Sequence, residues 1–152
     1  MPNNTADGAT TAEVALRWFN ALSSGDIDAA LELAADDIEF VNYTPVPGYN
    51  TDMPWIGTHL GRDAVRRSFE EFGRVVAVDY AELIRIAVDR NSAAGVIREI
   101  STVRETGLKF EIEFVQWLTV QDGKIVYWKS YTDPSEILRA LRGPVLEREV
   151  SA

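Results

Sequence analysis

The spacing of apolar residues divides the chain into a helical first part and a strand-rich second part. Apolar side chains recur mostly at helical spacing over residues 14–22, 27–33 and 64–72. From residue 75 onward, long stretches alternate between apolar and polar residues, which is typical of half-buried strands. Helices first and a run of antiparallel strands afterwards predict an α+β fold.

The boundaries of these elements follow from capping and turn residues. The first helix is expected to begin at Thr10 or Thr11 and to end at Ser23-Ser24-Gly25, and Asp26 is expected to cap the second. The remaining predicted elements are a strand over 38–41, a helix over 62–74, strands over 75–88, 93–105, 108–120 and 124–132, and a short helix from Pro134. The strand over 75–88 is long enough that we expect it to be bent or bulged.

The ends of the chain and one long loop lie outside this pattern. Small polar residues predict a disordered tail over 1–10, a single domain over 11–142 and a C-terminal tail over 143–152. The loop over 43–60 contains three prolines and two glycines, which disfavour regular structure. It also carries Tyr43, Tyr49 and Trp55, which either close the mouth of a binding site or simply pack the loop.

Composition and charge exclude several classes of function. The length of 152 residues fits one domain, and a net charge of −9 disfavours nucleic acid and anionic membranes as partners. With no cysteine and His59 as the single histidine, we expect no metal and no cofactor. The absence of a signal core or an apolar run of spanning length predicts a cytoplasmic protein.

The hairpin formed by the strands over 93–105 and 108–120 predicts which side chains face inward. If Thr106-Gly107 is a two-residue turn, Glu99 lies opposite Phe114, Ser101 opposite Ile112 and Ile97 opposite Gln116. One face of the hairpin is then apolar, with Ile97, Val103, Ile112, Phe114 and Leu118, and the other is charged, with Arg98, Arg104, Lys109, Glu111 and Glu113. The apolar face is the interior, so Glu99 is predicted to be a lone carboxyl group in an apolar environment.

A buried carboxyl group without a cationic partner has a raised pKa and can act as a general acid or base near neutral pH. Glu99 is therefore the predicted catalytic residue. The alternative is that Glu99 pairs with a buried arginine or lies in water at the mouth of the pocket.

Three segments resemble the nuclear-transport-factor-2-like superfamily, in particular its SnoaL-like and limonene-epoxide-hydrolase-like members. They are RWFNALSSGDIDAALELAADDIEFVN, GRDAVRRSFEEF and FVQWLTVQDGKIVYWKSYTD, which with the spacing between them extend the resemblance over about residues 12–141. The resemblance implies a curved antiparallel sheet wrapped around three to four helices as a cone with an internal pocket. It also implies a homodimer through the outer face of the sheet, where Trp117 and Tyr127 are expected among charged residues.

The resemblance also assigns roles to individual positions. By resemblance to the limonene-epoxide-hydrolase-like members, Glu99 of this chain matches the position of their proton donor. Asn42 matches the position of their water-holding asparagine. The second aspartate of that group is replaced by Ser130, its arginine by Ile97 and its tyrosine by Phe40. Without that base and arginine, the two-aspartate hydrolysis of epoxides is not expected.

The resemblance to ketosteroid isomerases, another branch of the superfamily, likewise implies that this chain lacks the usual catalytic groups. Asn42 falls where that family has its base, Trp18 where it has its phenol, and Gln116 near its protonated acid. An amide at position 116 can still polarise a carbonyl group but cannot supply a proton. Together with Glu99, the predicted pocket contains Trp18, Phe40, Asn42, Tyr43, Trp55, Phe72, Ile97, Ser101, Ile112, Phe114, Gln116, Trp128 and Ser130. For Trp18, Phe72 and Trp128, ordinary core packing is the alternative.

These residues predict a cofactor-free enzyme that performs one acid/base step on an apolar polyketide- or terpene-like substrate. The reaction would be a cyclisation, an isomerisation or the opening of an epoxide, of the kind found in secondary metabolism. Two alternatives remain open. One is a non-catalytic module that binds an apolar small molecule, and the other is an interaction domain that uses the outer face of the sheet.

Overall fold

The computed structural model describes residues 3–143 and the side chains from residue 10 onward. The helices are Asn3–Ser23 (α1), Ile27–Glu32 (α2), Arg62–Val75 (α3) and Ser135–Arg142 (α4). The strands are Ala34–Asn42 (β1), Gly57–Leu60 (β2), Val76–Asp89 (β3), Ser92–Val103 (β4), Lys109–Gln121 (β5) and Lys124–Tyr131 (β6). They form one sheet in the order β2-β1-β6-β5-β4-β3, in which only the β1–β6 pair is parallel. The predicted α+β cone is confirmed.

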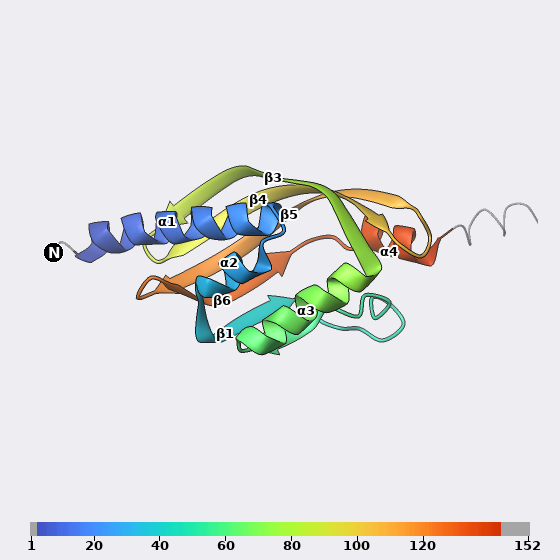
Figure 1. The fold of residues 1–152 in the computed structure, drawn as a ribbon, viewed down its shortest axis with the longest axis horizontal. Coiled ribbons are helices and arrows are strands. Elements are labelled where there is room, and N and C mark those ends of the chain that lie inside the picture. Colours follow the sequence, from blue (N-terminus) through green and yellow to red (C-terminus); the bar gives the residue numbers. More distant parts are fainter. Residues whose placement is uncertain (1–2, 144–152) are drawn as a thin grey trace, which may run out of the picture.

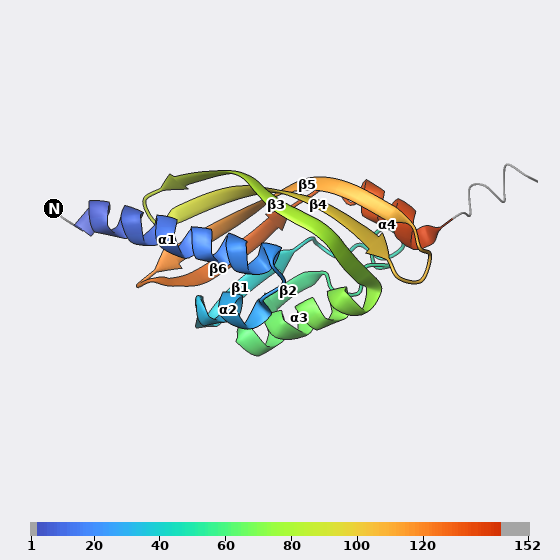
Figure 2. The same ribbon diagram turned by 45° about the horizontal axis from the view of Figure 1, so that its top comes forward.

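Helices α1, α2 and α3 are arranged along one side of the curved sheet (Figure 1). The first helix, α1, packs against β3 and β4, whereas α3 packs against β1 and β2 on the other half of the sheet. The last helix, α4, lies at the end of the sheet far from the N-terminus and contacts β5 and β4, as Figure 2 shows. The space between the sheet, α1 and α3 is therefore the interior of the cone.

The curvature of the sheet is accompanied by two bulges in β3. One extra residue, Asp79, lies between the pairs formed by Val78 and Tyr80, and a second, Ile84, lies between those of Leu83 and Arg85. An extra residue bends its strand and increases the local twist. The expectation of a long, bulged strand is therefore confirmed.

Two hydrophobic clusters fill the cone. The larger one joins α1, α2 and α3 to the sheet and includes Trp18, Phe19 and Trp128. The smaller one lies at the α4 end and includes Met53 and Trp55, which are 1% and 4% exposed. The loop that precedes α3 thus contributes its apolar side chains to the core.

Several predicted boundaries are wrong. The first helix begins at Asn3, so residues 3–10 are helical rather than a disordered tail, and Thr11 is buried within α1 instead of capping it. The strand expected from Ile38 begins at Ala34, because it pairs there with Ile125. The loop over 43–60 ends in the short strand β2, which pairs with β1. The predicted C-terminal tail, apart from Gly143, lies outside the described residues.

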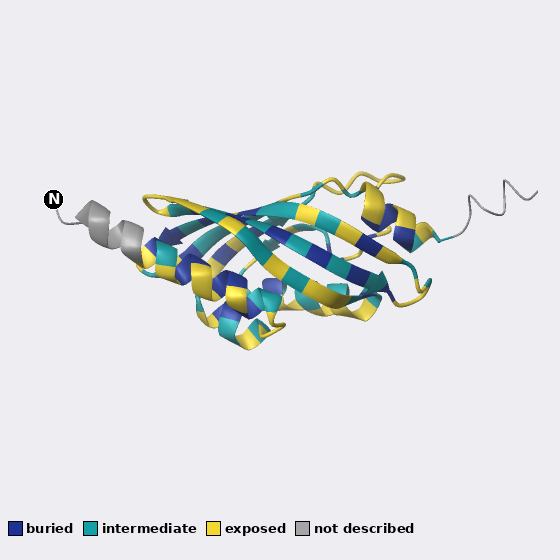
Figure 3. Cartoon of the chain, turned by 90° about the horizontal axis from the view of Figure 1, so that it is seen from above, coloured by how far each residue is buried: buried dark blue, intermediate teal, exposed yellow. Residues whose placement is uncertain are grey.

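The register of the β4–β5 hairpin differs by two residues from the prediction. The observed pairs are Ile97 with Phe114, Glu99 with Ile112 and Ser101 with Phe110. The turn is longer than two residues, because the Val103 N–H donates to the Leu108 carbonyl, which leaves residues 104–107 as the connection. A shift of two residues preserves the face on which each side chain lies. The predicted division into inner and outer faces is therefore confirmed, and Figure 3 shows the alternation of burial along the long strands.

Candidate functional site

Glu99 lies in the middle of β4 and points into the cone. It is 9% exposed, and its neighbours across the sheet are Ala81 on β3 and Ile112 on β5. Burial raises the pKa of its carboxyl group, and a hydrogen bond of 2.7 Å from the Ser101 hydroxyl to Oε2 acts in the opposite direction. Among the described residues, no arginine or lysine forms an ion pair with Glu99. The prediction of an unpaired carboxyl group in the interior is confirmed.

An inner cavity of about 130 Å³ lies on one side of Glu99. It is bordered by β1, β4, β5, β6, α3, α4 and the loop after β1. Its lining comprises Phe40, Asn42, Tyr43, Trp55, Ser68, Phe69, Phe72, Glu99, Ile112, Phe114, Gln116, Trp128, Ser130, Thr132 and Ile137.

An outer cavity of about 530 Å³ lies on the other side of Glu99, between β3 and the ends of α1 and α3. Its lining comprises Phe19, Leu22, Ser23, Ser24, Gly25, Ile27, Phe69, Phe72, Gly73, Val76, Val78, Ala81, Ile97, Glu99, Arg104, Phe114 and Gln116. The two cavities share Phe69, Phe72, Glu99, Phe114 and Gln116. We call these five residues the waist, and Glu99 is its only ionisable side chain.

Tyr43 provides a second ionisable group in the inner cavity. Burial raises the pKa of its phenol to about 12; a hydrogen bond with Thr132 lowers it, and the charge of Glu99 raises it further. The phenol is therefore neutral near pH 7 and lies within the electrostatic reach of Glu99. The backbone of Tyr43 has φ 58°, a left-handed conformation that costs energy for a residue with a Cβ and that recurs at functional sites.

Gln116 is oriented by a tryptophan behind the cavity. The Trp18 Nε1–H donates to the Gln116 side-chain carbonyl at 3.3 Å, so the amide NH₂ group remains as a donor. Because Gln116 lines both cavities, this donor belongs to the waist. A neutral amide next to a carboxyl group is suited to binding a carbonyl oxygen.

An aromatic cluster around Trp128 forms one wall of the inner cavity. Phe40 stacks on Trp128 with ring centroids 3.5 Å apart, and Trp18 meets it edge to face at 4.9 Å. Within the described part of the chain, the buried Trp128 Nε1–H has no hydrogen-bond partner. Such rigid ring packing fixes the shape of the cavity wall.

Most of the predicted pocket residues converge on the inner cavity. Those that line it are Phe40, Asn42, Tyr43, Trp55, Phe72, Glu99, Ile112, Phe114, Gln116, Trp128 and Ser130. Ile97 lines the outer cavity instead. Trp18 and Ser101 are completely buried and line neither cavity, and they act on it through Gln116 and Glu99.

The prediction missed several lining residues. Ser68 and Phe69 lie on the same face of α3 as the predicted Phe72, and helical spacing from Phe72 would have found them. Thr132 follows Ser130 at strand spacing and was detectable in the same way. The sequence contains no comparable pattern for the outer cavity. Its wall combines the ends of α1 and α3 with β3, and only the folded chain brings these segments together.

The loop before β2 is held in place by its own polar groups. The Asn50 side chain accepts from the Val46 N–H at 2.8 Å and donates to the Thr44 carbonyl at 3.0 Å. Arg142 of α4 forms an ion pair with Asp52 at 3.1 Å and also donates to a loop carbonyl. Tyr43 and Trp55 cover the inner cavity from this loop, whereas Tyr49 is 48% exposed and lines neither cavity.

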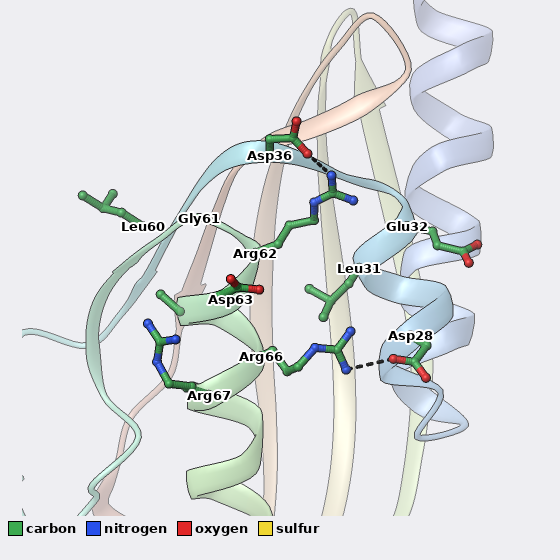
Figure 4. A pocket seen from close by; sticks show the side chains of 11 residues that line it. Asp28, Leu31, Glu32, Asp36, Leu60, Gly61, Arg62, Asp63, Arg66 and Arg67 are labelled. Atoms are coloured by element: carbon green, nitrogen blue, oxygen red, sulfur yellow. Dashed lines mark hydrogen bonds and ion pairs between the residues drawn. The ribbon is translucent and has the colours of Figure 1, made fainter.

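A larger hollow of about 830 Å³ lies on the surface between α2 and the start of α3 (Figure 4). Arg66 forms an ion pair with Asp28 at 2.8 Å, and Arg62 pairs with Asp36. These side chains are largely exposed, so they are screened by water and form a solvated surface rather than a site for chemistry.

Two kinds of feature are absent from the described residues. No three His, Cys, Asp or Glu side chains are grouped in a way that would hold a metal ion. None of the helices has the length and hydropathy needed to cross a membrane.

Solved structures show that this fold is widespread. The chain is similar to a nuclear-transport-factor-2-like protein from Burkholderia xenovorans, with 23% identity, coverage of 88% of this chain and 97% of that chain, and a TM-score of 0.72. It is similar to a candidate SnoaL-like polyketide cyclase from Mesorhizobium loti, with 24% identity, coverage of 79% and 97%, and a TM-score of 0.66. A candidate isomerase from Bacillus subtilis has 17% identity, coverage of 89% and 94%, and a TM-score of 0.72. At these identities the likeness establishes the fold, which hosts many activities.

A family comparison is more specific than these structural likenesses. The model of the SnoaL-like domain matches residues 15–128, which include the C-terminal part of α1, all of α2 and α3, five complete strands and most of β6. The matched segment contains Glu99 and the rest of the waist. The chain therefore belongs to the SnoaL-like domain family.

Proposed function

We propose that the protein is an enzyme that uses Glu99 as a general acid and base on an apolar small molecule, in an isomerisation, a cyclisation or the opening of an epoxide. The observation that carries this proposal is the buried, unpaired carboxyl group where two cavities meet. Perturbed ionisable groups in clefts are characteristic of active sites.

In an isomerisation, the Glu99 carboxylate takes a proton from a carbon atom next to a carbonyl group. The electron pair of that C–H bond moves into an enolate, and the Glu99 carboxylic acid returns the proton at another carbon. A raised pKa makes the carboxylate a stronger base. It also brings the pKa of Glu99 closer to the working pH, so that the group can both take up and release the proton.

Neutral donors around Glu99 support the enolate in this scheme. The Gln116 amide and the Tyr43 phenol keep their protons at neutral pH and donate to the oxygen of the enolate. Donors that are already oriented stabilise developing charge without reorganisation. In a cyclisation, the same groups would orient the carbonyl that is attacked. For an epoxide, a hydroxyl group of the substrate would add to the carbon as its C–O bond breaks, Glu99 would protonate the leaving oxygen, and the proton of the attacking hydroxyl would return to the Glu99 carboxylate.

The names of related proteins agree with this choice of chemistry. Two of the similar structures are described as a candidate polyketide cyclase and a candidate isomerase. A cyclisation or an isomerisation that passes through an enolate needs proton transfer at a carbon next to a carbonyl group, which one carboxyl group can perform.

Glu99→Gln provides the test. Gln retains the size of Glu but cannot transfer a proton, so turnover should fall roughly 10²–10⁴-fold. Activity would be measured with a panel of β,γ-unsaturated ketones and epoxides that carry apolar rings, by absorbance and by exchange of the protons next to the carbonyl into D₂O. Glu113→Gln is the matched control, because Glu113 is exposed on the outer face of β5.

Wild-type turnover in Glu99→Gln would refute the proposal. The second candidate function is a non-catalytic binding module, which is favoured by the presence of Ser130 where related enzymes have a second carboxylate. If the wild type binds members of the panel but converts none of them, and Glu99→Gln binds equally well, this second function is correct.

A further inference from the structure

We propose that Trp18 is a positioning residue, whose indole N–H fixes the Gln116 side chain so that the amide NH₂ group, and not the amide oxygen, is presented to the waist. Trp18 lines neither cavity, so it acts through Gln116. The effect on turnover rests on the function proposed above, in which Gln116 donates to an oxygen of the substrate. The orientation of the amide is tested independently of turnover.

The hydrogen bond between Trp18 and Gln116 decides the orientation of the amide. An indole N–H can only donate, so its partner at 3.3 Å must be the amide oxygen. The reversed amide would place its NH₂ group against the indole N–H, and neither donor would then have an acceptor. Because Trp18 is completely buried and Gln116 is only 6% exposed, bulk water does not replace the lost bond. Trp18 therefore holds the amide in one of its two orientations.

The NH₂ end of the Gln116 amide borders the cavities. It forms no hydrogen bond with another described residue. In the described part of the chain, Trp128 Nε1 is the only fully enclosed polar side-chain atom without a partner, so the Gln116 nitrogen is not enclosed in this way. Since Gln116 lines both cavities, its NH₂ group is open to a molecule bound there. With its oxygen held by Trp18, Gln116 offers that molecule a donor and no acceptor.

Gln116 and Glu99 lie apart on the same inner face of the sheet. Glu99 pairs with Ile112 on β5, and Gln116 lies four residues further along that strand, with Phe114 between them on the same face. At about 3.3 Å per residue, this spacing corresponds to roughly 13 Å along the strand. A bound molecule can therefore touch both side chains at once. An amide in the reversed orientation would turn its oxygen toward the charge that develops on a substrate oxygen and would repel it.

The packing role of Trp18 can be separated from its hydrogen bond. Trp18 meets Trp128 edge to face with ring centroids 4.9 Å apart, a contact that a phenylalanine ring can also make. The indole adds the N–H group, whose partner is Gln116. Trp18→Phe therefore removes the hydrogen bond and keeps an aromatic ring against Trp128.

Benzonitrile bound to the full chain tests the orientation of the amide, because its nitrogen accepts hydrogen bonds and it has no proton to transfer. The infrared C≡N band rises in frequency when the nitrogen accepts a hydrogen bond, and the wild type should show this rise. In Trp18→Phe, and in Gln116→Met, which keeps the length of the side chain without its amide, the band should fall toward its position in hexane. Val14→Ala, a buried change on α1 outside both cavities, should keep the raised band.

A double-mutant cycle tests the same contact in turnover of the panel described above. Trp18→Phe should lower kcat roughly tenfold and change KM less than about twofold, because the cavity walls remain while the donor is no longer held in place. Gln116→Met should lower kcat by roughly 10²-fold. Adding Trp18→Phe to Gln116→Met should not lower kcat further, because no amide remains for the indole to hold. Val14→Ala should keep the kcat of the wild type.

The proposal is overturned if Trp18→Phe leaves the nitrile band of the wild type in place, or if it lowers kcat as much in Gln116→Met as in the wild type. Thermal melts establish that the variants are folded. Should Trp18→Phe not fold, the indole ¹H–¹⁵N resonance of Trp18 decides, because it should move upfield in Gln116→Met and an unchanged resonance overturns the proposal. If Glu99→Gln keeps the turnover of the wild type while the nitrile band responds as expected, the reaction proposed above fails and the role of Trp18 stands.

Discussion

At the scale of single residues, the environment of Glu99 links stability to pH. In the unfolded chain this carboxyl titrates near its ordinary pKa of 4.5, whereas burial raises its pKa in the folded protein. The folded state thus holds the proton to higher pH, so this contribution to stability is present at low pH and is lost as the pH rises through the raised pKa.

We therefore expect Glu99→Gln to be more stable than the wild type at neutral pH, because Gln resembles the protonated acid and never ionises. The difference in unfolding free energy should shrink as the pH falls and vanish below about pH 4. Urea titrations of both proteins between pH 4 and pH 8 measure it. A constant difference across this range would contradict the raised pKa.

A second residue-scale prediction concerns Ser101, whose hydroxyl donates to the Glu99 carboxylate at 2.7 Å. Ser101→Ala removes a bond that favours the ionised form, so the pKa of Glu99 should rise further. The pH–rate profile of a reaction that needs ionised Glu99 should move to higher pH, while the maximal rate is largely retained. Thr102→Val, which removes the neighbouring outward hydroxyl that binds Asp79, should leave the profile in place.

At the scale of secondary-structure elements, the contact between α1 and β4 depends on one glycine. A Cβ at Gly95 would lie 2.4 Å from the ring of Phe19, which is 1% exposed and cannot move away freely. Gly95→Ala should therefore destabilise the protein by about 1–3 kcal/mol. Gly73→Ala in α3, with open space around its Cβ, should instead stabilise it by about 0.5–1 kcal/mol. Chemical denaturation would show both, and equal effects of the two changes would refute this account of Gly95.

The arrangement of the strands, the loop and α3 around the site was only partly predictable from the sequence. Inner and outer faces of β4 and β5 were predictable because alternation with a period of two tolerates a register error of two residues. The register itself was not, because a four-residue connection around Gly107 replaces the expected tight turn. Tyr43 was predicted in the pocket, but what holds it there was beyond the sequence pattern, namely a left-handed backbone and a loop fixed by Asn50. Likewise, the division of the pocket at Phe69, Phe72 and Phe114 arises only when α3 packs against the sheet.

At the scale of the whole molecule, the outer face of the sheet presents large side chains to solvent. Trp117 on β5 and Tyr131 on β6 are 39% and 52% exposed. We predict a homodimer through this face, which would need to bury about 800 Å² on each partner. Trp117→Glu should shift the protein to a monomer in sedimentation equilibrium, whereas Leu16→Glu, an exposed position on α1, should not. A monomeric wild type would contradict the prediction.

The two bulges of β3 also affect how the molecule behaves in crowded solution. β3 is an open edge of the sheet with fourteen residues, and a straight edge of that length is a template on which another chain can add a strand. The extra residues Asp79 and Ile84 interrupt its regular spacing, and two charged residues lie nearby, Glu82 between them and Arg85 directly after the second. Deleting one extra residue would leave the other residues paired with β4 as before, but it would restore the regular spacing and straighten the rim, which favours fibrous self-association. The bulges that help to curve the sheet thus also disfavour edge-to-edge strand pairing between copies of the protein.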